Sequence, residues 1–285
     1  MANEHEAFPL PDLRFVPVEA LVPHEQHDAH RMDALAQKLR EEPALKNPPV
    51  VSPLGTPGGT GARFVVLDGA NRATAAREAG FPHMVVQVVR YEEPHVRLAT
   101  WYHALADLQP NELQRELMRI PGLTCHTEER IHGRALLARR EALACVVSDF
   151  AAVITLLGGA DLEQRNALLN AVVDIYRHRK FYRVATDSLA AARVRHPDVT
   201  ATIVFPHFEP DEILELAMSG ARLPAGITRH LIRWRALRVN VPIERLADTR
   251  QTLDEKNRWL AAWVADRAAT RHVRFYEEST VLFDE

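Results

Sequence analysis

Cysteine is scarce in this chain, and its scarcity excludes two classes of protein. The 285 residues include only two cysteines, Cys125 and Cys145, which are too few for a disulfide framework and form no CxxC pair. The histidines show no metal-ligand spacing such as HExxH. We therefore expect a protein of a reducing compartment, without a metal site built from its own side chains.

Long apolar runs and an excess of positive charge are also missing. The apolar stretch at 142–157 is interrupted by Ser148 and Asp149, so we expect no membrane span. The first residues, MANEHEAFPLPDLRF, lack the basic and apolar regions of a secretion signal, which predicts a cytoplasmic protein. The net charge of -3 does not show the basic excess of a dedicated DNA-binding protein, although it is compatible with a local basic patch.

Strand and helix patterns alternate over the first hundred residues or so. Strands are predicted at 13–22, 48–54, 63–69 and 83–91, helices at 30–41 and 70–79, and a flexible loop at 55–62. Further on, helices are predicted at 128–157 (unbroken or with one break), 162–177, 210–219 and 248–269, a strand at 198–205, and alternating strands after 272. These patterns predict an α+β fold with one domain at 1–104 and a larger, mostly helical α+β domain at 105–285.

The segment VLDGANR at 66–72 has the pattern of a phosphate-binding turn. Gly69 allows the backbone to approach a ligand closely, and the free N–H groups at the start of the following helix can hold phosphate oxygens. Arg72 can add a charge-assisted hydrogen bond, and Asp68 can orient a metal ion or a substrate hydroxyl. An ordinary Asp-Gly turn at a helix start explains the same pattern equally well.

Three further segments carry candidate site residues, each with a structural alternative. Glu25 in LVPHE can act as a general base, or it is a surface glutamate before a helix. In LPAGITRH, Thr228, Arg229 and His230 can hold a carboxylate or phosphate, or Arg229 pairs with a structural carboxylate. Trp101 in ATWYHAL can form the wall of a small pocket, or it belongs to the core between domains.

Taken together and in this order, these segments resemble the free L-serine kinase family with a ParB/sulfiredoxin-like fold, of the type that serves staphyloferrin B siderophore biosynthesis. The resemblance runs through LVPHE, FVVLDGANR, ATWYH, RLPAGITRH, NVPIERL and FYEESTVLF, and PAGITRH with NVPIERL is its most specific part. It implies a ParB/sulfiredoxin-like nucleotide-binding domain at 1–104 and a domain at 105–285 that completes the amino-acid site. The implied reaction transfers a phosphoryl group from ATP or ADP, with Mg2+, to free L-serine. Its product, O-phospho-L-serine, would serve siderophore, diaminopropionate or related amino-acid biosynthesis.

The resemblance also assigns roles to individual residues. Glu25 matches the catalytic glutamate that activates the serine hydroxyl, and Asp68 matches the acidic residue beside the phosphates and that hydroxyl. It places the phosphates on Gly69, Ala70, Asn71 and Arg72, and the amino acid on Trp101, Thr228, Arg229 and His230. Asn71 stands where many members have histidine, and asparagine can donate to a phosphate but cannot carry a charge. We therefore expect weaker activity or a different donor if that charge matters.

Two alternatives stay open from the sequence, a DNA-binding regulator and an inactive binding protein, and a third, a reductase, is nearly excluded. A ParB-like DNA-binding regulator of a biosynthetic cluster would use the four arginines within 126–144, and its DNA affinity would fall steeply with salt. A sulfiredoxin-like reductase needs a cysteine in the phosphate turn, where this chain has Ala70 and Asn71. A catalytically inactive protein that keeps the binding pocket is the other open alternative. The sequence predicts no oligomeric state.

Overall fold

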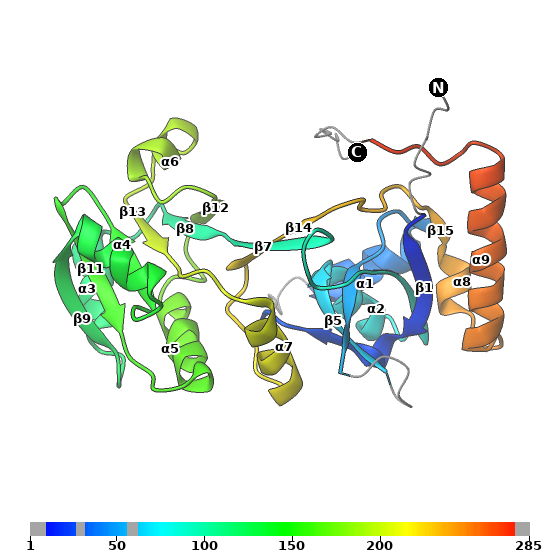
Figure 1. Ribbon diagram of the computed structural model, residues 1–285, viewed down its shortest axis with the longest axis horizontal. Helices are drawn as coiled ribbons and strands as arrows, with labels where there is room; N and C mark the ends of the chain where they lie inside the picture. The colour runs from blue at the N-terminus through cyan, green and yellow to red at the C-terminus, as the bar shows by residue number, and fades with distance from the viewer. Residues whose placement is uncertain (1–9, 27–31, 56–61, 277–285) are drawn as a thin grey trace, which may run out of the picture. The chain divides into compact units, whose positions relative to one another are not determined.

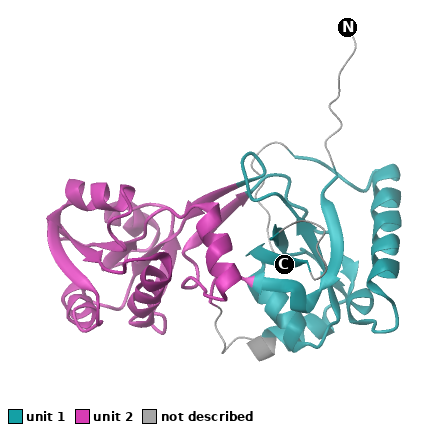
Figure 2. Ribbon diagram, turned by 60° about the horizontal axis from the view of Figure 1, so that its bottom comes forward, with its two compact units in different colours: residues 1–22, 28–96, 232–285 teal, residues 23–27, 97–231 magenta. Residues whose placement is uncertain are grey.

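The computed structural model describes residues 10–26, 32–55 and 62–276. The chain forms two compact units (Figures 1 and 2): unit 1 comprises residues 1–22, 28–96 and 232–285, and unit 2 comprises residues 23–27 and 97–231. This division differs from the expected boundary after residue 104, because the last part of the chain returns to the first unit. In the part of the chain described, no helix combines the length and apolar character that crossing a bilayer requires.

Unit 1 is built on a mixed sheet with the strand order β1-β6-β4-β5-β2. Its strands are β1 (Asp12–Pro17), β2 (Leu21–Pro23), β4 (Val50–Leu54), β5 (Arg63–Asp68) and β6 (His83–Val88). β4 runs parallel to β6, whereas β1 pairs with β6 and β4 with β5 in antiparallel fashion. Apolar and β-branched runs such as 64–67 are buried, as expected for strands of a covered sheet.

Short elements and two helices complete the N-terminal part of unit 1. They are η1 (Val18–Ala20), α1 (Met32–Glu41), β3 (Ala44–Leu45) and α2 (Ala70–Glu78), and β3 pairs with β15 (Val241–Pro242). Helix α2 buries Ala73, Ala75 and Ala76 in the core, because small side chains allow a helix to lie close to its neighbours. The helices α1 and α2 pack against each other (Figure 1).

The C-terminal helices α8 (Ile243–Ala247) and α9 (Leu253–Ala269) belong to the core of unit 1. Leu246 and Leu260 are fully buried in the same cluster as Phe15. The side-chain amide of Asn257 accepts a hydrogen bond from the backbone N–H of Phe15 (2.8 Å) and donates one to its carbonyl (3.0 Å). Strand β1 lies at the edge of the sheet, so Asn257 satisfies backbone groups that would otherwise face no strand.

Unit 2 contains an antiparallel sheet in the order β12-β8-β13-β10-β11-β9. Its strands are β8 (Tyr102–Leu105), β9 (Thr124–Glu129), β10 (Ala144–Val147), β11 (Ala152–Leu157), β12 (Phe181–Val184) and β13 (Ala201–Val204). The helices are α3 (Pro110–Leu117), α4 (Arg130–Ala138), α5 (Leu162–Asp174), α6 (Leu189–Arg195) and α7 (Pro210–Ser219), and a separate ladder joins β7 (Val96–Thr100) to β14 (Thr228–Ile232). The predicted α+β class is confirmed.

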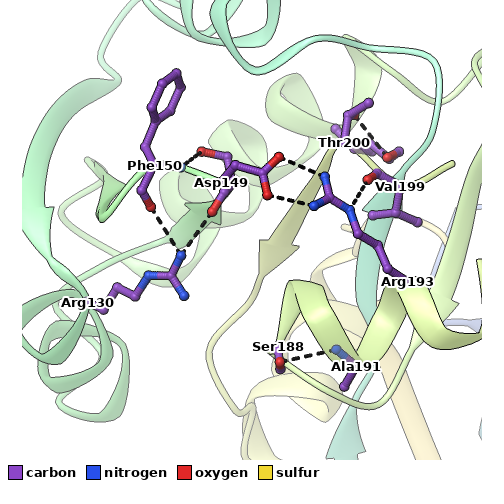
Figure 3. A network of polar contacts seen from close by, with 10 residues as sticks. Arg130, Asp149, Phe150, Ser188, Ala191, Arg193, Val199 and Thr200 are labelled. Atoms are coloured by element: carbon purple, nitrogen blue, oxygen red, sulfur yellow. Dashed lines mark hydrogen bonds and ion pairs between the residues drawn. The ribbon is translucent and has the colours of Figure 1, made fainter. Parts of the chain in front are cut away.

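The predicted helix at 128–157 is wrong beyond Ala138. Helix α4 ends at Ala138, Arg140 follows with a left-handed φ of 63°, and the rest of the segment is a hairpin of β10 and β11. Two arginines hold the turn of this hairpin (Figure 3): Arg130 donates to the carbonyls of Ser148 and Phe150, and Arg193 makes two hydrogen bonds with Asp149. The density of valine and isoleucine here favours strands over a helix.

The other predicted elements agree with the structure to within a few residues at most ends. The helices at 30–41, 70–79, 162–177, 210–219 and 248–269 correspond to α1, α2, α5, α7 and α9. The strand predicted at 13–22 divides into β1 and β2 on either side of η1. The predicted loop at 55–62 and the strands predicted after 272 lie largely outside the described residues.

Candidate active site

Glu25 is fixed beside a segment that is distant in the sequence but belongs to the same unit. It forms a parallel β-bridge with Leu223, in which Gln26 donates to the Leu223 carbonyl and Leu223 donates to the His24 carbonyl, both at 2.8 Å. The backbone hydrogen bonds of His24 and Gln26 with Leu223 therefore fix the position of the Glu25 Cα, from which the side chain extends. The segment that follows Leu223 carries the TRH motif.

The Glu25 carboxylate accepts three hydrogen bonds from the described residues of this segment. Gly226 N–H donates to Oε2 (2.8 Å), while the N–H and hydroxyl of Thr228 donate to Oε1 (2.7 and 2.6 Å). An ionised carboxylate has about four acceptor positions, so one further donor can be accommodated. Gly226 adopts a φ of +78°, a conformation that L side chains rarely adopt, so the backbone at this position favours glycine.

His24 supports the same arrangement from the buried side. Its side chain is 3% exposed, and its Nε2 lies 2.8 Å from the hydroxyl oxygen of Thr228. The single hydroxyl hydrogen of Thr228 goes to Glu25, so His24 must be the donor and carries its proton on Nε2. The His24 ring also meets the His230 ring edge-on, with centroids 5.1 Å apart. The sequence analysis did not single out His24, although it immediately precedes Glu25.

Arg229 and Trp101 form a stacked pair. The guanidinium carbon of Arg229 lies 4.3 Å from the centroid of the Trp101 ring, and the backbone N–H of Trp101 donates to the Ile227 carbonyl at 2.7 Å. The face of the Trp101 ring attracts the guanidinium charge and keeps it close to the ring. This geometry suits recognition of a carboxylate.

A buried histidine holds the Gly226 peptide from its other side. His103 is fully buried; its Nδ1 lies 2.8 Å from the Tyr176 hydroxyl, and its Nε2 lies 3.1 Å from the Gly226 carbonyl. Burial lowers the pKa of His103 to about 4, so the ring is neutral at pH 7. Because a carbonyl only accepts, Nε2–H donates to Gly226 and Nδ1 accepts from Tyr176. Gly226 is thus held at its backbone N–H by Glu25 and at its carbonyl by His103, which fixes the peptide groups on both sides of it.

Asp68 ends strand β5 of unit 1, and α2 begins two residues later. Gly69 makes the turn with a φ of 85°, and a Cβ there would lie 3.1 Å from the Cα of Pro49. Ala73 N–H donates back to the Gly69 carbonyl at 3.0 Å, so the amides of residues 70–72 are the first of the helix. Asn71 is exposed, and Arg72 donates to Oδ2 of Asp68 at 3.0 Å.

Arg235 is a second cationic partner of Asp68 that the sequence analysis missed. Its guanidinium donates to Oδ2, the oxygen that also accepts from Arg72, and about a third of each side chain is exposed. The loop that carries Arg235 is held by the buried side chain of Gln87, which donates to the Trp234 carbonyl (3.0 Å) and accepts from the Ala236 N–H (2.8 Å). The signal in the sequence was weak, because RWRALR matches no phosphate-binding motif.

The predicted site residues therefore fall into two groups. The Glu25 cluster comprises Glu25, Trp101, Thr228, Arg229 and His230, and all of it lies in unit 2. The Asp68 cluster comprises residues 68–72 together with Arg235, and it lies in unit 1.

Within the described residues, no group of three or more His, Cys, Asp or Glu side chains is placed to hold a metal ion. Mg2+ is usually bound by one or two carboxylates together with substrate phosphates. Asp68, at the start of α2, fits the role of a single carboxylate ligand of this kind.

The contacts of other residues bear on the alternative functions. The four arginines of 126–144 all have partners within unit 2: Arg130 bonds the hairpin turn, and Arg134, Arg139 and Arg140 pair with Asp187, Glu141 and Glu212. This segment is a strand followed by a helix, rather than one long basic helix. Cys145 is 3% exposed, and burial raises its pKa to about 11, which makes its thiol unreactive.

Comparison with known proteins gives no match to a family model. An ATP-dependent L-serine kinase of Staphylothermus marinus is 32% identical over 90 residues, which is 32% of this chain and 34% of that protein. The ATP-dependent L-serine kinase SbnI of Staphylococcus aureus is 22% identical over 280 residues, which is 96% of this chain and 97% of that protein. The chain thus matches about a third of the first relative and nearly all of the second.

Solved structures extend the similarity to the fold. A free serine kinase in complex with AMP superposes with a TM-score of 0.67 at 18% identity, covering 83% of this chain and 94% of that one. The resemblance found in the sequence is therefore confirmed: the chain is similar in sequence to ATP-dependent L-serine kinases and shares its fold with a free serine kinase.

Proposed function

We propose that this chain is an ATP-dependent kinase that phosphorylates the hydroxyl of free L-serine. The observation that carries the proposal is the Glu25 cluster, in which a carboxylate is bonded to the same short segment that presents Arg229 and His230. A base for a hydroxyl and a cation for a carboxylate thus occur together, and free serine has both groups. The ATP dependence follows the names of the relatives.

Arg229 binds the serine carboxylate through two parallel N–H donors, and Trp101 keeps the guanidinium plane in a single orientation. The acceptor position of Glu25 that the segment leaves unused takes the hydrogen of the serine hydroxyl. His230, which packs against His24, completes the recognition of the polar groups of serine.

On the nucleotide side, the first amides of α2 and the side chain of Arg72 hold phosphate oxygens. Asp68 would be the protein ligand of Mg2+, which would supply positive charge to the donor phosphates. Asn71 supplies a neutral hydrogen-bond donor at the start of α2, where many members of the free L-serine kinase family have a histidine. The product, O-phospho-L-serine, suits siderophore or diaminopropionate biosynthesis in the cytoplasm.

The test incubates the purified chain with L-serine, Mg2+ and either ATP or ADP, and follows phosphoserine by mass spectrometry. Glu25→Gln should abolish phosphoserine formation and leave ATP binding intact. Glu215→Gln, which changes an exposed glutamate on α7 of the same unit, serves as the matched control and should turn over normally. No phosphoserine from the wild-type chain with either nucleotide would reject the proposal.

A second arm tests the amino-acid site. Arg229→Ala should raise the KM for serine by about 100-fold while the KM for ATP changes less than about twofold, because a charged bidentate contact is lost on one substrate only. An unchanged KM for serine would remove Arg229 from the substrate site.

A further inference from the structure

We propose that Arg235 is a phosphate-binding residue of the kinase, which leaves Asp68 and binds the β- or γ-phosphate when ATP is present. The inference rests on the proposed function and adds to it a residue that the family motifs did not indicate.

The charge of the Asp68 cluster favours an anion. One carboxylate oxygen accepts hydrogen bonds from two guanidinium groups, Arg72 and Arg235, so the three side chains together carry a net positive charge. They lie at the start of α2, where the helix dipole adds further positive potential. A polyphosphate entering this site offers several anionic oxygens, whereas Asp68 offers one carboxylate for two cations.

The backbone around Arg235 is held in place before any ligand arrives. Gln87 on strand β6 is 3% exposed. Its side-chain N–H donates to the carbonyl of Trp234, the residue before Arg235, and its side-chain oxygen accepts from the N–H of Ala236, the residue after it. Trp234 has a left-handed φ of 53°, and Arg233 stacks over its ring at 4.2 Å. Because the flanking backbone is fixed, only the side chain of Arg235 needs to move.

The exchange of partners also serves Asp68. With ATP bound, Arg235 moves its hydrogen bond from Oδ2 of Asp68 to a phosphate oxygen, and no covalent bond changes. Asp68 then loses one of its two cationic partners, and its carboxylate becomes available for the role proposed above. Phosphoryl transfer gains from fixed positive charge at the oxygens of the transferred group.

The experiment measures binding of ATP and of AMP by isothermal titration calorimetry, without serine. Arg235→Gln should weaken ATP binding by about tenfold or more, the usual effect of losing a charge-assisted hydrogen bond, while AMP binding stays within about twofold. Arg235→Lys should recover part of the ATP affinity. Arg238→Gln, in the same loop but with its backbone N–H bonded to Asn47, should bind both nucleotides like the wild type.

Two results would overturn the inference. An equal loss for ATP and AMP would show that Arg235 only shapes the site, and unchanged ATP binding would show that it does not contact phosphate. Thermal unfolding of each variant checks that the unit remains folded. A wild-type chain that binds no ATP would instead contradict the proposed function, so the two failures are distinguishable.

Discussion

His103 should make the stability of unit 2 depend on pH. Its ring is fully buried between the Tyr176 hydroxyl and the Gly226 carbonyl, and its pKa falls from 6.5 to about 4. In the unfolded chain, the same ring is hydrated and takes up a proton near pH 6.5. The unfolded state therefore binds more protons than the folded state between these two pH values.

The sign and size of the effect follow from this difference. His103 contributes no pH dependence above about pH 6.5, where the ring is neutral in both states. As the pH falls towards 4, protonation favours the unfolded chain, so the free energy of unfolding decreases. A shift of this size corresponds to about 3 kcal/mol over the whole window, and most of it is lost by about pH 4.5.

The assay compares urea unfolding of the wild type and His103→Gln at pH 7 and at pH 4.5, followed by circular dichroism. Glutamine retains a donor for the Gly226 carbonyl but does not titrate, so it serves as the matched variant. The wild type should lose about 2 to 3 kcal/mol more than the variant between the two pH values. Carboxylates titrate in both proteins and cancel in this comparison. Equal losses would refute the placement of a neutral, buried His103.

Three further substitutions test the contacts around the site and the core. Gly226→Ala places a Cβ on a residue with a left-handed φ; we expect a loss of about 1–2 kcal/mol in urea unfolding and a loss of phosphoserine formation, and wild-type values would contradict the geometry. Thr228→Val removes the hydroxyl between Glu25 and His24, and should lower kcat about tenfold with little change in KM for ATP. Asn257→Ala removes both hydrogen bonds to Phe15 and should cost about 1–3 kcal/mol, measured by thermal unfolding; an unchanged Tm would show that water replaces them.

Elements with a strong local pattern could be predicted from the sequence. Helix α7 begins at Pro210 and ends before Gly220, and α2 follows the turn at Gly69. A few adjacent residues therefore determine where these helices begin or end. The prediction of a helix over 128–157 failed in its second half. Alanine, leucine and arginine dominate the first half and favour a helix, whereas the second half forms the hairpin of β10 and β11. Ser148 and Asp149 interrupt the apolar run, and they prove to be part of a hairpin turn.

The division into units could not be predicted in the same way. A periodic pattern shows that α9 has an apolar face, but it does not show which core that face enters. Leu260 joins the cluster around Phe15, which is formed by the other end of the chain. Such pairings depend on the three-dimensional path of the chain between them.

The site shows the same contrast between local and distant contacts. Residues 68–72 form one turn, so their proximity follows from the sequence. The bond from Gly226 to Glu25 joins residues 201 positions apart, and that from Arg235 to Asp68 joins residues 167 positions apart. Motif order suggested the first of these contacts only through a resemblance, and nothing in RWRALR suggested the second.

The return of α8 and α9 to unit 1 has a consequence for synthesis on the ribosome. Residues 97–231 of unit 2 emerge before the helices that cover β1, so unit 2 can finish folding while unit 1 still lacks part of its interior. Translation of that stretch takes on the order of ten seconds. During this interval the apolar side chains of β1 that pack against α8 and α9 remain exposed, and exposed apolar surface favours aggregation.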